Sequence, residues 1–190
     1  DLMSVLFSEG RTLLAVVLTH HHSDHSSGAV ALHRQYGIPI WAHPETAALL
    51  PFPIQRTLSE ADVLTLNGVA GMPSMTWELR HTPGHAPGHL TLVDRASKCA
   101  VVGDMVAGIG TILIDPPEGD MAEYLKQLAR LRDLPVTTLF PAHGPALPDG
   151  PGRLQGYIDH RQRREEMVYR AVQDAAGLSL SDVTQRAYWD

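Results

Sequence analysis

The chain has 190 residues with 44% hydrophobic content, a formal net charge of −6 and a single cysteine, Cys99. This length supports one substantial hydrophobic core with a small appendage. The acidic balance gives no support for non-specific nucleic-acid binding, and one cysteine excludes an internal disulfide. No apolar run approaches the ~20 residues that cross a bilayer, so we expect no membrane contact and a cytoplasmic, reducing location.

The order of apolar runs, helix caps and turn formers predicts a mixed α/β chain. In the first half we expect a buried strand over 13–18, a short helix over 29–36 closed by Gly37, a strand over 38–42 and a helix over 44–50. Residues 51–75 are rich in turn formers and predict irregular or antiparallel edge structure.

In the second half, the pattern predicts strands over 75–79, 90–93, 99–102 and 136–140 and an amphipathic helix over 120–131. Leu147–Gly152 is rich in proline and glycine and is interpreted as a linker. A long helix is expected from Arg153 to about Ala176, followed by a short helix capped by Ser179 or Ser181.

Four metal-competent side chains lie within six residues, directly after the first predicted strand. They are His20, His22, Asp24 and His25 of the segment Leu18-Thr-His-His-His-Ser-Asp-His25. Imidazole and carboxylate ligands in this combination suit zinc or a similar first-row ion. The end of a strand is a common place for chemistry in layered α/β folds.

Three further candidate ligands, His85, Asp104 and His143, also follow predicted strands. Such loops converge on one edge of a sheet, so all seven side chains are expected to share one pocket. Five imidazoles and two carboxylates exceed the four ligands of one tetrahedral zinc ion. The sequence therefore predicts two divalent metal ions.

Four motifs in this order resemble those of the metallo-beta-lactamase superfamily: Thr19-His-His-His-Ser-Asp-His25, Pro83-Gly-His85, Gly103-Asp104 and Ala142-His-Gly144. The resemblance implies a four-layer αββα sandwich. It also implies that one ion is bound by His20, His22 and His85, and the other by Asp24, His25 and His143, with Asp104 bridging both. The antiparallel strands with which family members begin are absent here.

Further motifs look like the beta-lactamase-like protein 2 group: Pro116-Pro-Glu-Gly-Asp120, Pro145, and Tyr157-Ile-Asp-His-Arg161 followed by Arg164-Glu165. This resemblance implies a metallo-beta-lactamase domain over 1–152, incomplete at its N-terminus. Residues 153–190 would begin a C-terminal winged-helix-like domain, also incomplete. Animal members of the group are similar to endoribonucleases that cleave single-stranded RNA.

The ligand set predicts a hydrolase that uses a hydroxide shared by the two ions. Two divalent ions, two aspartates and this hydroxide leave a net charge of about +1, which favours a small anionic or phosphodiester substrate. Bound ions lower the pKa of water from 15.7 towards about 7. Asp24 is expected to orient the nucleophile and accept its proton, besides being a ligand.

Several other side chains have both a functional and a structural interpretation. His89, His160 and Arg164 are candidate substrate contacts; a structural role for His89 and a solvated helix face for the other two are the alternatives. His21 is expected to point away from the metals. His81 either supports His85 through a hydrogen bond or only packs.

The leading functional hypothesis is a dinuclear metal hydrolase, with single-stranded RNA as the first substrate considered. A thioester hydrolase of the glyoxalase II type and a lactonase are enzyme alternatives, and a metal-stabilised binding module is the non-enzyme alternative. Zinc is the expected metal, and manganese or iron would also suit these ligands. The sequence leaves the oligomeric state open.

Overall fold

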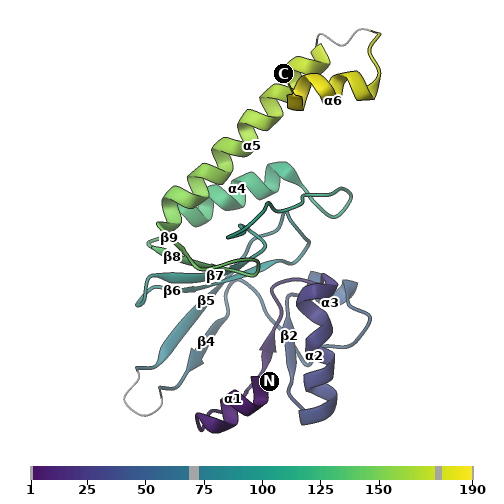
Figure 1. The fold of residues 1–190 in the computed structure, drawn as a ribbon. Coiled ribbons are helices and arrows are strands. Elements are labelled where there is room, and N and C mark those ends of the chain that lie inside the picture. Colours follow the sequence, from purple (N-terminus) through teal and green to yellow (C-terminus); the bar gives the residue numbers. More distant parts are fainter. Residues whose placement is uncertain (1, 69–72, 174–176, 190) are drawn as a thin grey trace.

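The computed structural model describes residues 2–68, 73–173 and 177–189 (Figure 1). Two sheets lie face to face, and helices cover their outer surfaces. Six of the nine strands in the described ranges lie where a strand was expected, and the expected αββα sandwich is confirmed. No helix in the described ranges has the length and apolar character needed to span a membrane.

The larger sheet has six strands in sequence order. They are β4 (Val63–Leu66), β5 (Met75–His81), β6 (Leu90–Asp94), β7 (Cys99–Gly103), β8 (Thr138–Pro141) and β9 (Leu147–Pro148). Only β7 and β8 pair in parallel, because α4 (Met121–Arg132) lies in the connection between them. Since β5 and β7 each run antiparallel to β6, the strands β5, β7 and β8 all end at the same edge.

The smaller sheet has three short parallel strands, β1 (Val16–Val17), β2 (Ile40–Ala42) and β3 (Arg56–Thr57). Its outer face is covered by α2 (Ser23–Tyr36) and α3 (Pro44–Leu49). The N-terminal α1 (Leu2–Ser8) was not expected from the sequence. Residues 51–75 contribute two short edge strands: β4 is antiparallel, as expected, whereas β3 pairs in parallel with β2, and 69–72 lie outside the described residues.

Helix α2 begins at Ser23, six residues before the position expected from the sequence. The serine-rich segment before Ala29 is poor in helix formers, which is why it was interpreted as a turn. Tertiary contacts override this preference: Ser26 donates its hydroxyl to the His21 carbonyl, and Asp24 lies in the first turn, where the helix dipole favours a negative charge. As a result, Asp24 and His25 are placed on a helix rather than on a loop.

The expected linker at 147–152 is also wrong, because it forms β9 and the first turn of α5 (Gly150–Gln173). Asp149 begins this helix: its carbonyl accepts the Arg153 N–H, and its carboxylate accepts the Gly152 N–H at 3.3 Å. Proline at the second helical position lacks an N–H that would have no partner there. The expected end of the helix near Ala176 lies outside the described residues.

The predicted final helix is confirmed as α6 (Leu180–Trp189). It begins with a reciprocal cap in which the Asp182 N–H donates to Ser179 Oγ at 3.2 Å and Ser179 N–H donates to the Asp182 carboxylate at 3.0 Å. Arg164 of α5 places its guanidinium 3.6 Å from the centre of the Tyr188 ring. The cap stabilises the start of α6, and the cation–π contact joins α6 to the distal half of α5 (Figure 1).

Three clusters of buried side chains fill the spaces between the layers. The main cluster lies between the larger sheet and the helices α4 and α5, with Tyr124 and Leu128 fully buried. A second lies between the smaller sheet and α2, and a third around Leu79 and Leu90 joins the two sheets. Leu154 and Ile158 extend the main cluster, so the first half of α5 packs on the core. The division into two domains near residue 152 stays a prediction.

Truncation of Leu154 tests whether α5 is part of the core. We expect Leu154→Ala to lower the free energy of unfolding of the metal-free protein by about 2–5 kcal/mol, since it removes a fully buried side chain. The matched control is Leu180→Ala, where the side chain is 83% exposed and the change should stay within about 0.5 kcal/mol. Urea unfolding measures both, and equal effects would place α5 outside the core.

Candidate metal centre

The seven predicted ligands come together at one edge of the sandwich. His85, Asp104 and His143 follow β5, β7 and β8, whose ends meet at this edge. His20 and His22 lie in the segment between β1 and α2. The Leu90 N–H donates to the Thr19 carbonyl at 2.8 Å, which joins this segment to the start of β6 in the larger sheet.

Three imidazole nitrogens of the first group converge on one point. His20 Nε2 lies 3.0 Å from His22 Nδ1 and 3.3 Å from His85 Nε2, and the last two atoms are 3.1 Å apart. Around an ion that binds nitrogen at about 2.0–2.1 Å in tetrahedral geometry, ligand nitrogens lie about 3.3 Å apart. The spacing of these side chains therefore fits a single first-row ion.

Hydrogen bonds to the other ring nitrogens orient these imidazoles. His85 Nδ1 donates to the Leu113 carbonyl at 2.8 Å, which leaves a lone pair on Nε2 facing the other two rings. His20 Nδ1 lies 3.0 Å from the Thr19 hydroxyl. Burial, reinforced by the surrounding imidazoles, lowers the pKa of His20 far below its usual range, and burial lowers the pKa of His85 as well. Both rings are thus held in the neutral form that binds metal.

The second group consists of Asp24, His25 and His143. Asp24 Oδ2 lies 3.4 Å from His25 Nε2 and 3.5 Å from His143 Nε2. The three donor atoms fall within the span of one metal site. His25 is mostly buried, whereas Asp24 and His143 are half exposed, so this side of the centre faces solvent.

Asp104 lies between the two groups. Its Oδ2 is 3.6 Å from both His85 Nε2 and His25 Nε2 and 3.4 Å from His143 Nε2. Asp104 Oδ1 and His25 Nε2 are buried without a hydrogen-bond partner among the described residues, a costly state unless an ion binds there. This donor set fits two cations with one shared carboxylate; the assignment of each ligand stays a prediction.

The charges around Asp104 oppose the effect of its burial. Burial acts to raise the pKa of this carboxyl, but the nearby imidazoles of His25, His85 and His143 hold it below its usual range. Burial likewise acts to lower the pKa of His25, and the Asp104 carboxylate outweighs this and raises it. Asp104 is therefore ionised at neutral pH.

His89 does not reach the substrate side of the centre, so the expected substrate contact is wrong. Its side chain is fully buried, its Nε2 accepts the Asp104 N–H at 3.2 Å, and its Nδ1 lies 2.9 Å from the Thr82 hydroxyl. Thr82 in turn pairs with Thr91 at 3.0 Å. A Cβ on Gly103 would lie 2.6 Å from His89 Nε2, so this ring fits only against glycine. His89 positions the backbone of Asp104.

The two predicted substrate contacts on α5 differ in their surroundings. His160 is exposed and lines a cavity of about 390 Å³ with Arg153, Tyr157 and neighbouring glycines. Arg164 instead lies over the Tyr188 ring, so its expected contact with substrate is not supported by this position.

Two residues of α5 that were not predicted as site residues hold the loop beside the centre. The Tyr157 hydroxyl accepts the Ala107 N–H at 2.9 Å and donates to the Ala107 carbonyl at 3.0 Å. Arg161 donates to the Ile112 carbonyl, one residue before the carbonyl that binds His85. The motif at 157–161 was noticed in the sequence, but only its helical spacing could be derived there.

His21 points away from the three-imidazole group, as expected, and its Nε2 lies 3.1 Å from Glu118 Oε2. His81 stacks on His43, with ring centres 4.1 Å apart, and the described structure shows no hydrogen bond from its side chain to His85. The packing interpretation of His81 therefore fits its position.

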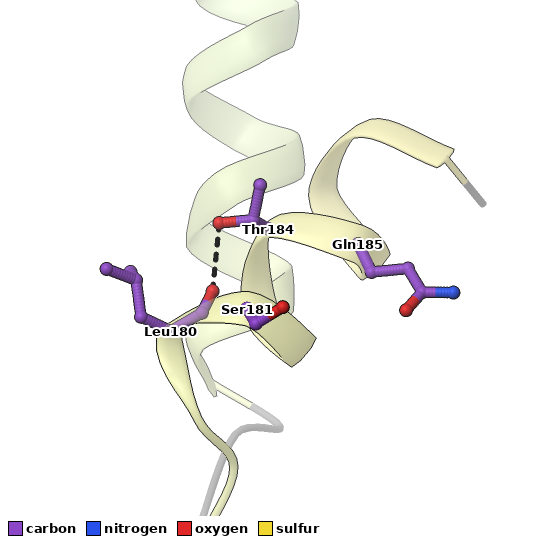
Figure 2. A pocket seen from close by; sticks show the side chains of 4 residues that line it. All are labelled: Leu180, Ser181, Thr184 and Gln185. Atoms are coloured by element: carbon purple, nitrogen blue, oxygen red, sulfur yellow. Dashed lines mark hydrogen bonds between the residues drawn. The ribbon is translucent and has the colours of Figure 1, made fainter.

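A cavity of about 330 Å³ opens beside His22 and His85. A larger hollow of about 690 Å³ lies against α6, lined by Leu180, Ser181, Thr184 and Gln185 (Figure 2). It is wide open and contains none of the candidate ligands. The Thr184 hydroxyl donates its hydrogen bond to the Leu180 carbonyl of its own helix. We therefore assign the metal-dependent chemistry to the cavity beside His22 and His85.

The pH dependence of stability tests the burial of His89. Burial lowers the pKa of His89 to about 3, so at pH 5 the unfolded chain binds a proton that the folded chain does not. Stability from this group is full above about pH 6.5 and falls as the pH drops. Between pH 7 and pH 5 it should contribute a loss of about 2 kcal/mol. Urea unfolding of the metal-free proteins measures this effect. Between pH 7 and pH 5, the free energy of unfolding should fall by about 2 kcal/mol less in the His89→Gln variant than in the unsubstituted protein. An equal fall in both proteins would contradict the prediction.

Replacement of Arg161 tests whether α5 supports the first ligand group. Lysine lacks the planar guanidinium group of arginine. We therefore expect Arg161→Lys to weaken metal binding by His20, His22 and His85 roughly tenfold, the low end of the effect for residues that support a metal ligand. Arg163→Lys, at an exposed position of the same helix, is the control. Isothermal titration of the metal-free proteins measures both, and unchanged affinity would remove Arg161 from this role.

Comparison with known proteins agrees with the geometry. The sequence profile described as Metallo-beta-lactamase superfamily matches residues 4–143. The chain is 26% identical over 196 residues to a beta-lactamase-like protein 2 homolog of Caenorhabditis elegans, covering all of this chain and 62% of the relative. It is 29% identical over 179 residues to an atrochrysone carboxyl ACP thioesterase of Aspergillus fumigatus, covering 92% of this chain and 52% of the relative.

A solved structure shows the same fold with metal present. The crystal structure of TTHA1623 in a di-iron-bound form has a TM-score of 0.65 and 26% identity, and the match covers 79% of each chain. The chain spans between about half and two thirds of the length of the curated relatives above. With the profile match extending over most of its length and its histidine and aspartate groups gathered at one edge, the chain belongs to the metallo-beta-lactamase superfamily.

Proposed function

We propose that this chain forms the catalytic part of a metal-dependent hydrolase with a dinuclear centre. The observation that carries the proposal is the position of Asp104, whose Oδ2 lies within 3.6 Å of nitrogens from both ligand groups. A purely structural zinc site is closed by four protein ligands. Here seven side chains would serve two ions, one fewer than two closed four-ligand sites need, and the half-exposed Asp24 and His143 leave that side of the centre open to a water or a substrate atom.

The residues that would hold the ions are His20, His22 and His85 on one side and Asp24, His25 and His143 on the other, with Asp104 common to both. When bound, two divalent ions supply an acidified water and stabilise negative charge that develops on the substrate. The ligands are equally compatible with zinc, manganese and iron. We propose zinc, with iron as the first alternative because of the di-iron-bound neighbour.

Asp24 is the candidate proton acceptor. Its side chain is 60% exposed, while the other carboxylate, Asp104, is 9% exposed. It therefore faces the solvent from which the attacking water comes and can pass a proton on. No serine or cysteine nucleophile is required, and Cys99, the only thiol, is buried in β7.

For the substrate we propose a thioester first. Relatives named as thioesterases for an acyl group on a carrier protein match most of this chain. Hydrolysis adds water across the C–S bond and releases a carboxylic acid and a thiol. Single-stranded RNA is the second candidate, supported by the similarity to a beta-lactamase-like protein 2 homolog. A lactone is a third substrate class with the same carbonyl chemistry.

Other expectations from the sequence remain proposals. These are a cytoplasmic location and a winged-helix-like arrangement beginning with α5 and α6. The acidic net charge of −6 and the 6% aromatic content do not favour RNA as the natural substrate.

Metal analysis and turnover test the proposal together. We expect the protein loaded with zinc, iron or manganese to bind two equivalents and to hydrolyse a simple thioester faster than bis-p-nitrophenyl phosphate. Asp104→Ala should lower turnover by more than about 100-fold, the upper end for residues that only support a ligand. The exposed Asp133→Ala is the control.

A protein that binds two ions but turns over neither substrate would fit the binding-module hypothesis instead. Normal rates in Asp104→Ala would remove this residue from the mechanism. Faster cleavage of the phosphodiester than of the thioester would favour RNA.

A further inference from the structure

The cavity beside the first ligand group has one wall made by a single loop. His22 and His85 form its floor, and residues 113 and 115–118 form the wall. The wall combines apolar surface from Leu113 and two prolines with the carboxylates of Asp115 and Glu118. No arginine or lysine lines this cavity among the described residues. Apart from the two imidazoles of the floor, a substrate group bound here would meet apolar and negatively charged surface.

Glu118 is held in place at this wall. Its Oε2 lies 3.1 Å from His21 Nε2 and 3.6 Å from His22 Nε2. His21 therefore anchors the carboxylate from behind, while His22 presents its other nitrogen to the first ligand group. The side chain of Glu118 is 46% exposed and lines the cavity, while its Oε2 contacts the mostly buried His21.

The carboxylates of the wall change the net charge around the metal centre. Two divalent ions, two aspartates and a hydroxide leave a charge of about +1. Adding the carboxylates of Asp115 and Glu118 makes the region around this cavity about −1. A second negative charge on the substrate, beyond the oxygen that develops charge during hydrolysis, would be repelled here.

We propose that this cavity receives the acyl part of the substrate and that Glu118, assisted by Asp115, selects acyl groups without a negative charge. The inference rests on the proposed thioester hydrolysis and names the class of acyl group. Aliphatic acyl chains fit the proline and leucine surface, and an amino-substituted chain gains attraction to the two carboxylates. Dicarboxylic acyl groups and polyanions such as RNA are disfavoured.

Three thioesters of N-acetylcysteamine with similar length and different charge test the proposal. They carry butyryl, β-alanyl and succinyl groups. The metal-loaded protein should have its lowest kcat/KM on the succinyl thioester. Glu118→Gln removes the negative charge but keeps an oxygen that can accept a hydrogen bond from His21. In this variant, the ratio of kcat/KM on the butyryl thioester to kcat/KM on the succinyl thioester should fall about fivefold, the upper end of the effect of one exposed ion pair. Glu165→Gln removes the same charge from an exposed position of α5 and should leave the ratio unchanged.

A binding measurement separates the two proposals. Isothermal titration of the metal-free protein with the corresponding non-hydrolysable thioethers reports on the cavity without turnover. If none of the three thioesters is hydrolysed, thioester hydrolysis fails as the function, while weakest binding of the succinyl thioether still supports the selectivity. Equal binding of succinyl and butyryl compounds, or a ratio that is unchanged in Glu118→Gln, overturns the inference.

Discussion

The common direction of β5, β7 and β8 is the constraint on which the rest of the site depends. Because these strands end at one edge, three side chains separated by up to 58 positions, His85 to His143, meet although each lies only one to four residues beyond the end of its strand. The hydrogen bond from Leu90 to Thr19 brings the histidine-rich segment to the same edge. The ligands therefore belong to a rigid scaffold, which reduces the conformational cost of binding metal.

Asp104 shows how the core supports the centre. Its N–H is bound by a fully buried His89, and Gly103 leaves the space that this ring occupies. The hydroxyls of Thr82 and Thr91 continue the chain of hydrogen bonds into the interior. A carboxylate with one unpartnered, buried oxygen is thus fixed in place through its backbone as well as by the imidazoles around its other oxygen.

Much of this arrangement could be predicted from the sequence, because the ligand motifs are dense and each follows an apolar strand. The strands β1, β2 and β5 to β8, the helix α4 and the sandwich were expected correctly, whereas β9 lies in the segment interpreted as a linker. The early start of α2 and the first turn of α5 were missed, since serine, proline and glycine there suggest turns and only tertiary contacts make them helical. The buried role of His89 and the contacts of Arg161 depend on residues distant in sequence, which no local pattern reveals.

One feature of α5 links distant parts of the molecule. Its first turns are buried against the sheet, its middle holds the loop at 107–113 through Tyr157 and Arg161, and its far end carries α6 (Figure 1). The Leu113 carbonyl on that loop sets the tilt of the His85 ring. Arg161 holds the Ile112 carbonyl and the next carbonyl, of Leu113, holds the His85 ring, so the helical arm formed by α5 and α6 is joined to the metal-facing imidazole through two neighbouring hydrogen bonds.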